Sequence, residues 1–194
     1  MTFNEALSAV AIALTFYAFF PYIRSILKGD LKPHVFSWVI WGTTTFIVFF
    51  AQLDGGGGAG AWPTGISGLI TFYVAFLAYV KRGDIKIIAS DWVFFVAAMS
   101  SLPFWYMTSD PLWAVVILTS VDILGLGPTL RKAYNKPYQE SASFFVFIAI
   151  RNAISIIALE FYSITTVLFP AAVTFFCILL IIVIIYRRKE LLRR

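Results

Sequence analysis

Residues 164–186 read ITTVLFPAAVTFFCILLIIVIIY, contain no charged side chain, and are followed at once by Arg187, Arg188 and Lys189. A helix needs about 20 mostly apolar residues to cross the hydrocarbon core of a bilayer. This stretch is long enough, and it is apolar on every face, whereas a helix on the surface of a soluble protein has one polar face. It therefore predicts a membrane-spanning helix that ends in a basic segment.

The rest of the chain has the same character. Of its 194 residues, 60% are hydrophobic and 13% are charged, whereas roughly 25% are charged in an ordinary soluble domain. The bilayer is therefore the expected solvent, with one membrane domain as the simplest arrangement. The single cysteine, Cys177, excludes a disulfide within the chain. Together with the single histidine, His34, it also cannot supply the ligand set of a zinc ion.

Seven stretches meet the length criterion for a spanning helix. They lack the period-two alternation of barrel strands. The first has neither the basic start nor the cleavage pattern of a signal peptide, so we expect it to be retained. The sequence thus predicts an all-α membrane protein with seven transmembrane helices, at residues 4–27, 34–53, 62–81, 91–108, 111–131, 141–160 and 163–187.

Lysine and arginine residues are concentrated in every second connection between the predicted helices. Cytoplasmic connections of membrane proteins are enriched in these residues. Here they follow the first, third, fifth and seventh stretches, whereas the opposite connections carry acidic residues. We therefore expect the N-terminus outside and the C-terminus inside. The acidic residues are Glu5, Asp54, Asp110 and Glu160, and the basic ones are Arg24, Lys28, Lys32, Lys81, Arg82, Lys86, Arg131, Lys132, Lys136, Arg187, Arg188, Lys189, Arg193 and Arg194.

Parts of the chain recur at a spacing of about 107 residues, which is the signature of an internal repeat. The seven predicted helices divide into three helices, one linking helix and three further helices. The linking helix gives the last three the same orientation as the first three, so the two groups of three are expected to be parallel repeats. The predicted units are residues 1–83, a linker at 84–110, and residues 111–194. The matching residues are Pro21 and Pro128, Arg24 and Arg131, Pro63 and Pro170, Ser67 and Thr174, and Tyr79 and Tyr186. Pro63 and Pro170 are expected in the first turn of their helices, where proline is tolerated.

With this arrangement and the segments Phe20-Pro21-Tyr22-Ile23-Arg24 and Gly127-Pro128-Thr129-Leu130-Arg131, the chain resembles the SWEET and PQ-loop superfamily. The segments 32–38 and 136–141 resemble the basic loop and the serine entry to the next helix in that group. The residues after the two prolines are Tyr22 and Thr129, where the name-giving motif has glutamine. The resemblance implies a small-solute carrier that works by alternating access, with Pro21 and Pro128 as hinges. The alternative is that each proline only ends its helix.

Asp122 and Arg151 lie near the middle of the fifth and sixth stretches. An ion at the centre of a bilayer costs roughly 2.5–3.5 kcal/mol on insertion scales, and such residues are functional candidates by default. Because the two stretches are consecutive, we expect the two residues to pair and to remain ionised. The pair is either a structural lock between two helices or part of a substrate or proton site.

Neutral polar residues occupy the corresponding positions of the first repeat. Thr15 corresponds to Asp122, Thr44 to Arg151, and Thr45 to Asn152. Such a pocket suits a small polar or zwitterionic solute. If the solute displaced Arg151, Asp122 could take up a proton, which suggests proton coupling. The predicted binding residues are Asp122, Arg151, Asn152, Thr15, Thr44, Thr45 and Trp41, although Trp41 fits an interfacial aromatic belt equally well.

The leading functional hypothesis is a transporter or facilitator for a small polar solute. The alternative is a non-transporting membrane subunit, sensor or assembly partner with a structural Asp122–Arg151 pair. No residue cluster indicates an enzyme, a metal or a cofactor, and no feature indicates nucleic acid. The expected partners are the solute and anionic lipid head groups at the basic face, with a homo-oligomer left open. The expected absence of a cleaved signal and the compact size suit a prokaryotic inner membrane.

Overall fold

The structure is a computed structural model of the chain, and it describes residues 2–29, 35–81, 89–125, 130, 133–135, 137–139 and 141–193. Every regular element within these residues is helical, which confirms the all-α fold class. The elements are α1 (Phe3–Lys28), α2 (Val35–Asp54), the short 3-10 helix η1 (Gly58–Ala61), α3 (Trp62–Val80), α4 (Ala89–Thr108), α5 (Pro111–Gly125), η2 (Pro137–Gln139), α7 (Ala142–Ile157) and α8 (Ile164–Arg193).

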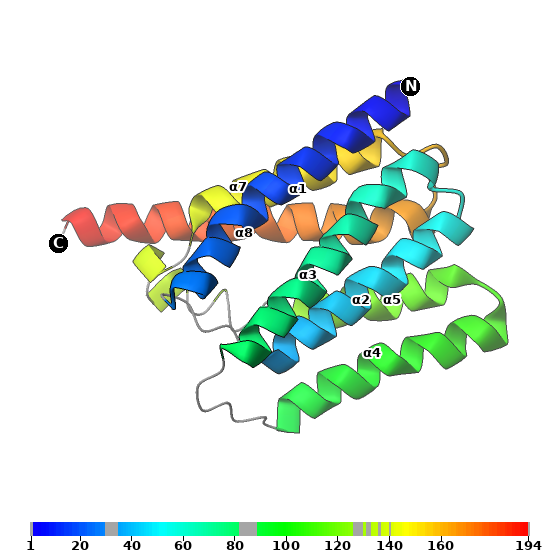
Figure 1. Cartoon of the computed structure of the whole chain (residues 1–194), viewed down its shortest axis with the longest axis horizontal. Helices are drawn as coiled ribbons and strands as arrows, with labels where there is room; N and C mark the ends of the chain where they lie inside the picture. Colours follow the sequence, from blue (N-terminus) through cyan, green and yellow to red (C-terminus); the bar gives the residue numbers. More distant parts are fainter. Residues whose placement is uncertain are drawn as a thin grey trace.

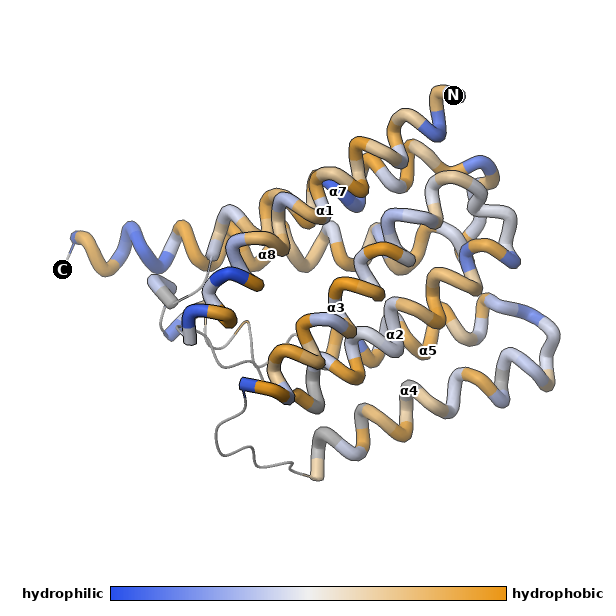
Figure 2. Tube along the Cα trace, viewed as in Figure 1, coloured by the Kyte–Doolittle hydropathy of each residue, from blue (hydrophilic) through white to orange (hydrophobic). Residues whose placement is uncertain are grey.

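Three segments of the described residues are long and apolar enough to cross a membrane. They are Phe3–Lys28, Gly58–Val80 and Ile164–Arg193, and two shorter helices, Pro111–Leu124 and Ala142–Ile157, are also apolar. Figure 2 shows hydrophobic residues along the helices and hydrophilic residues mostly near their ends. These helices give the chain the character of a membrane-associated protein.

The sequence at both ends of α1 determines where this helix begins and ends. Thr2 and Glu5 form a capping box, in which Thr2 Oγ1 accepts from the Glu5 N–H and the Glu5 carboxylate accepts from the Thr2 N–H. Such reciprocal bonds satisfy two backbone donors that a helix start leaves free. The helix then continues through Pro21 to Lys28 and ends at Gly29, whose φ of 82° suits glycine. Pro21 therefore does not end its helix, whereas Pro128 lies outside the described residues.

The helices form two trios with the same internal order. We call α1, α2 and α3 the first half, and α5, α7 and α8 the second half. In the first half α3 packs against both α1 and α2, and in the second half α8 packs against both α5 and α7 (Figure 1). Between the halves the packing is crosswise, because α1 contacts α7 and α2 contacts α5. The remaining long helix, α4, lies against α5 and α2.

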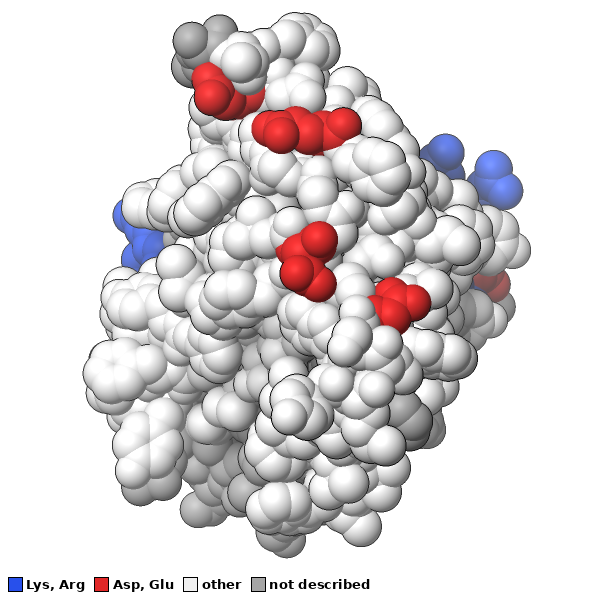
Figure 3. Space-filling model, turned by 90° about the vertical axis from the view of Figure 1, so that its right-hand side faces the viewer, with Lys and Arg blue, Asp and Glu red and all other residues white. Residues whose placement is uncertain are grey.

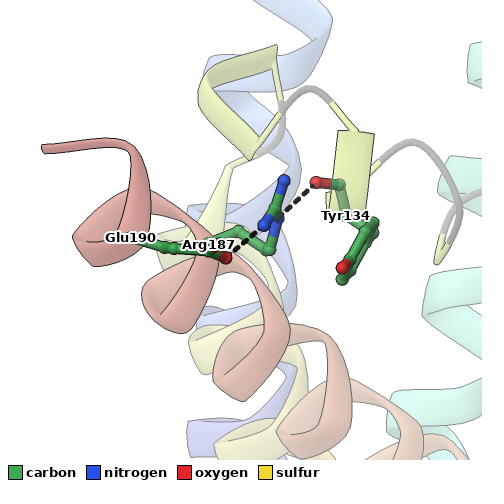
Figure 4. A network of polar contacts seen from close by, with 3 residues as sticks. All are labelled: Tyr134, Arg187 and Glu190. Carbon is green, nitrogen blue, oxygen red and sulfur yellow. Dashed lines mark hydrogen bonds and ion pairs between the residues drawn. The ribbon is translucent and has the colours of Figure 1, made fainter. Parts of the chain in front are cut away.

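The far end of α8 holds the described part of the connection between α5 and α7 (Figure 4). Arg187 Nε donates to the carbonyl oxygen of Tyr134 at 3.0 Å, and its guanidinium lies 4.2 Å from the centroid of that ring. Arg187 also forms an ion pair with Glu190. Arg188 donates through Nε and Nη2 to the carbonyl oxygen of Pro137, at 3.1 and 3.0 Å. Helix α8 continues to Arg193, beyond the expected end of its span at residue 187.

Candidate functional site

The predicted binding residues lie on four helices that meet between the two halves. Thr15 is on α1, Trp41, Thr44 and Thr45 are on α2, Asp122 is on α5, and Arg151 and Asn152 are on α7. The three threonines, Arg151 and Asn152 are buried, and Trp41 and Asp122 are half-buried. Since α1 packs on α7 and α2 packs on α5, the predicted residues lie on the helices that join the halves.

The expected pair of Asp122 and Arg151 is not formed, so that prediction is wrong. Asp122 Oδ1 accepts a hydrogen bond from Thr44 Oγ1 at 2.8 Å, whereas Arg151 Nη2 donates to Ser67 Oγ at 3.4 Å. The physical reason is the order of the helices, because α8 packs between α5 and α7 and separates these consecutive helices. The proton-coupling hypothesis loses its premise, since Arg151 does not neutralise Asp122.

The bond between Thr44 and Asp122 links α2 of the first half to α5 of the second half. We expect Thr44→Val, which keeps the shape of the side chain but removes the hydroxyl, to lower the free energy of unfolding by about 1–3 kcal/mol. The loss arises because the carboxylate of Asp122 loses its donor. Thermal unfolding in detergent measures the effect, with Thr44→Ser as the control that keeps the hydroxyl. Equal stability of the valine and serine variants would contradict a contribution from this bond.

Arg151 is a buried, charged residue with more N–H donors than hydrogen-bond partners among the described residues. Its side chain is only 3% exposed, and a guanidinium carries five N–H donors. The bond to Ser67 Oγ is long for an N–H donor, at 3.4 Å. Within the described residues, Arg151 Nε and Nη1 have no hydrogen-bond partner. Cys177 of α8 also lies beside this guanidinium, so Arg151 sits where α7 meets α3 and α8.

The neighbouring polar residues use their donors largely within their own helices. Thr15 Oγ1 donates to the carbonyl oxygen of Ala11 at 2.9 Å, and Asn152 Nδ2 donates to that of Ile148 at 2.9 Å. This local bonding is usual for Thr and Asn inside helices. It leaves Asn152 Oδ1 as a buried acceptor without a partner among the described residues. Arg151 and Asn152 therefore each keep buried polar atoms without a partner among the described residues, at consecutive positions of α7 that point about 100° apart.

A further polar link between the halves involves Gln52, which the sequence reasoning missed. Pro170 was expected in the first turn of its helix, but α8 begins at Ile164, so Pro170 lies in the second turn. Proline has no N–H, so the carbonyl oxygen of Thr166, four residues earlier, loses its helical donor. Gln52 Nε2 donates to this oxygen at 2.8 Å and is buried. The signal in the sequence was an amide near the end of one apolar run and a proline inside another.

This arrangement makes Gln52 and Pro170 energetically coupled. Gln52→Leu is expected to lower the free energy of unfolding by about 1–3 kcal/mol, because the buried carbonyl oxygen of Thr166 loses its donor. In a Pro170→Ala background the same change should cost less, since the alanine at position 170 supplies the missing N–H. A double-mutant cycle of unfolding free energies measures this coupling. Additive losses would show that Gln52 does not replace the proline donor.

At the end of the molecule that carries the acidic residues, which we call the acidic end, the halves touch through their backbones. Ala59 N–H donates to Glu160 Oε1 at 3.0 Å, and the N–H of Glu160 donates to the carbonyl oxygen of Gly57 at 3.3 Å. Gly58 has a φ of 54°, which favours glycine, and any side chain there would displace the Glu160 carboxylate from its bond to Ala59. Figure 3 shows the acidic side chains gathered on this end, with Lys and Arg only at its edges.

A cleft of about 450 Å³ opens at the acidic end. It is lined by the start of α1, Leu53, Gly58, Ala59, Trp62 and Glu160. None of the predicted binding residues lines this cleft. It therefore lies outside the predicted solute site.

Near the other end of α1, an aromatic cluster joins the halves on either side of Pro21. We define this cluster as Phe19 and Tyr22 of α1, Trp38 and Trp41 of α2, and Phe144 of α7. Phe19 and Tyr22 each contact both Trp38 and Phe144, with ring centroids 5.2–6.4 Å apart. Trp41 lies edge-on to Trp38 at 5.5 Å. Trp41 therefore belongs to a packed cluster between helices rather than to an exposed aromatic belt.

The described residues contain no group of three or more His, Cys, Asp or Glu side chains that could hold a metal ion. His34 lies outside them. Comparison with protein-family models, with curated proteins and with solved structures found no match for this chain. What the site can do therefore has to be argued from its own side chains.

Proposed function

We propose that the chain is a multi-pass membrane carrier for a small polar solute, built from two parallel repeats with the N-terminus outside. The same order of helices in both halves supports the repeat, and it agrees with the resemblance to the SWEET and PQ-loop superfamily. The acidic end, without Lys or Arg at its centre, supports the orientation (Figure 3). In this proposal the long helices α1, α2, α3, α4, α5, α7 and α8 all cross the bilayer.

The observation that carries this proposal is the polar contact between the halves. Hydrogen bonds cross it from Thr44 to Asp122, from Arg151 to Ser67 and from Gln52 to Thr166, and the last two of these bonds are buried. Ionisable side chains within membrane spans mark solute or ion paths by default. A purely structural interface would satisfy its own donors, whereas Arg151 keeps unpartnered donors within the described part of the chain.

Contacts at both ends of this polar layer support alternating access. The backbone contacts of Gly57 and Glu160 lie at the acidic end, and the aromatic cluster lies beside Pro21 toward the other end. Proline removes one helical hydrogen bond and permits bending. Opening of one end while the other stays closed would let a solute reach Arg151 from one side at a time. Pro21, inside α1, is the proposed hinge, and Pro128 is its counterpart in the second repeat.

The test is solute counterflow into liposomes that contain the purified protein, with a panel of labelled amino acids, hydroxy acids, sugars and polyols. The only thiol, Cys177, is buried beside Arg151 and gives a second signal through its rate of reaction with a small methanethiosulfonate reagent. We expect saturable counterflow of at least one solute, and that solute should change the rate at Cys177. Absence of both effects would overturn the proposal in favour of a non-transporting membrane subunit.

A further inference from the structure

The guanidinium of Arg151 is arranged to receive an anion. It is 3% exposed, and Nε and Nη1 together hold three of its five N–H donors without a hydrogen-bond partner among the described residues. A buried ion without a partner is costly, and buried charges are normally paired. Within the described residues Arg151 forms no ion pair. The half-buried carboxylate of Asp122, which was expected to pair with it, accepts a hydrogen bond from Thr44 instead.

The groups around Arg151 favour an anion over a neutral solute. Ser67 Oγ accepts one bond, and the buried Cys177 supplies a thiol. Neither group carries a full negative charge in its ordinary form at neutral pH. An arriving anion would therefore be the charged partner of the guanidinium. A hydroxyl of a sugar or polyol would satisfy single donors but leave the charge uncompensated.

The shape and charge of the donor set favour a carboxylate. A carboxylate accepts two parallel bonds from a guanidinium, either from Nε and Nη2 or from Nη1 and Nη2. Nη2 donates one hydrogen to Ser67 and keeps its second hydrogen for such a fork. One guanidinium carries one positive charge, so a monoanion neutralises it completely. A second negative charge, as on inorganic phosphate at neutral pH, would remain unbalanced at this depth.

We infer that the solute is a small monocarboxylate, such as a hydroxy acid, and that Arg151 binds its carboxylate group. This inference rests on the proposed carrier function and specifies the substrate class of that site. It assigns Arg151 as a binding residue that selects for charge.

The test compares lactate with lactamide, which has nearly the same shape but no charge. Thermal unfolding in detergent and counterflow in liposomes are measured for the wild-type chain, Arg151→Lys and Arg151→Met. We expect lactate to raise the unfolding temperature of the wild type and to bind at least about tenfold more tightly than lactamide, a factor that corresponds to about 1.4 kcal/mol. Arg151→Lys should keep a weaker preference, because it retains the charge but not the fork, and Arg151→Met should lose the preference.

Further arms separate this inference from the carrier function itself. Inorganic phosphate serves as the non-carboxylate anion. Equal responses to lactate and lactamide in the wild type, or a response to phosphate alone, would overturn the monocarboxylate assignment. Counterflow of sugars or polyols without any carboxylate response would overturn it while leaving the carrier function intact. Absence of counterflow for every solute would reject the carrier function as well. The wild-type comparison decides the matter even if Arg151→Met does not fold.

Discussion

Gly60→Ala is expected to force the two halves apart at the acidic end. A Cβ atom at position 60 would lie 2.5 Å from the backbone nitrogen of Leu159 and 2.7 Å from the carbonyl carbon of Ala158. Both are backbone atoms of the second half, so no side-chain rotation relieves the clash. Overpacking of this kind costs typically about 1–3 kcal/mol, and occasionally more. Thermal unfolding in detergent should show the loss of stability.

The same variant reports on the proposed movement of the halves. If the acidic end opens during transport, Gly60→Ala should favour that state and increase the rate of Cys177 modification from the acidic side of the membrane. Gly65→Ala is the matched control, because its Cβ would lie 2.9 Å from the ring of Phe49, which belongs to the same half and can turn. A similar rate at Cys177 in both variants would contradict an opening at the acidic end. A Gly60→Ala protein as stable as the wild type would contradict the tight backbone contact.

Much of the helical framework follows from the lengths of apolar runs. The bounds of α1, α2, α3 and α4 differ from the predicted spans by no more than two residues at either end, because apolar runs and the polar residues that flank them set these ends. The predictions are less accurate in the second half. Helix α5 is described as far as Gly125, and most of the remainder of its predicted span lies outside the described residues. Helix α7 ends at Ile157 rather than at 160. The segment after α7 instead packs against η1, and that tertiary contact is not encoded in hydropathy.

The candidate site was predictable by residue type but not by partner. The rarity of charges inside apolar runs identified Asp122 and Arg151, and the repeat identified Thr44. Partners depend on which helices touch, and sequence adjacency suggested α5 against α7. Helix α8 lies between them, so Asp122 is hydrogen-bonded to Thr44 and Arg151 is hydrogen-bonded to Ser67. The role of Gln52 required knowledge that α2 reaches Thr166, which lies 114 residues away along the chain.

Arg151→Met is expected to raise the free energy of unfolding while abolishing the lactate response. Methionine fills much of the volume of the arginine stem without a charge. Replacement of buried ionic groups by apolar residues of similar volume is often neutral or stabilising, by about 1–4 kcal/mol. Here the gain should be positive, because Arg151 has one long bond to Ser67 and no acidic partner within the described residues. Thermal unfolding in detergent without added solute measures it.

The sign of this change separates the two roles that Arg151 can have. A residue that only locks helices together lowers stability when it is removed, and removal of one partner of a satisfied buried pair costs about 3–5 kcal/mol. If Arg151 instead keeps its N–H donors free for a solute, its replacement by methionine should raise stability when that solute is absent. Ser67→Ala is the control, since it removes the only hydrogen-bonded partner of Arg151 in the described chain and should lower stability slightly. A large loss of stability in Arg151→Met would mean that the guanidinium is a structural group, and the solute site would then have to lie elsewhere.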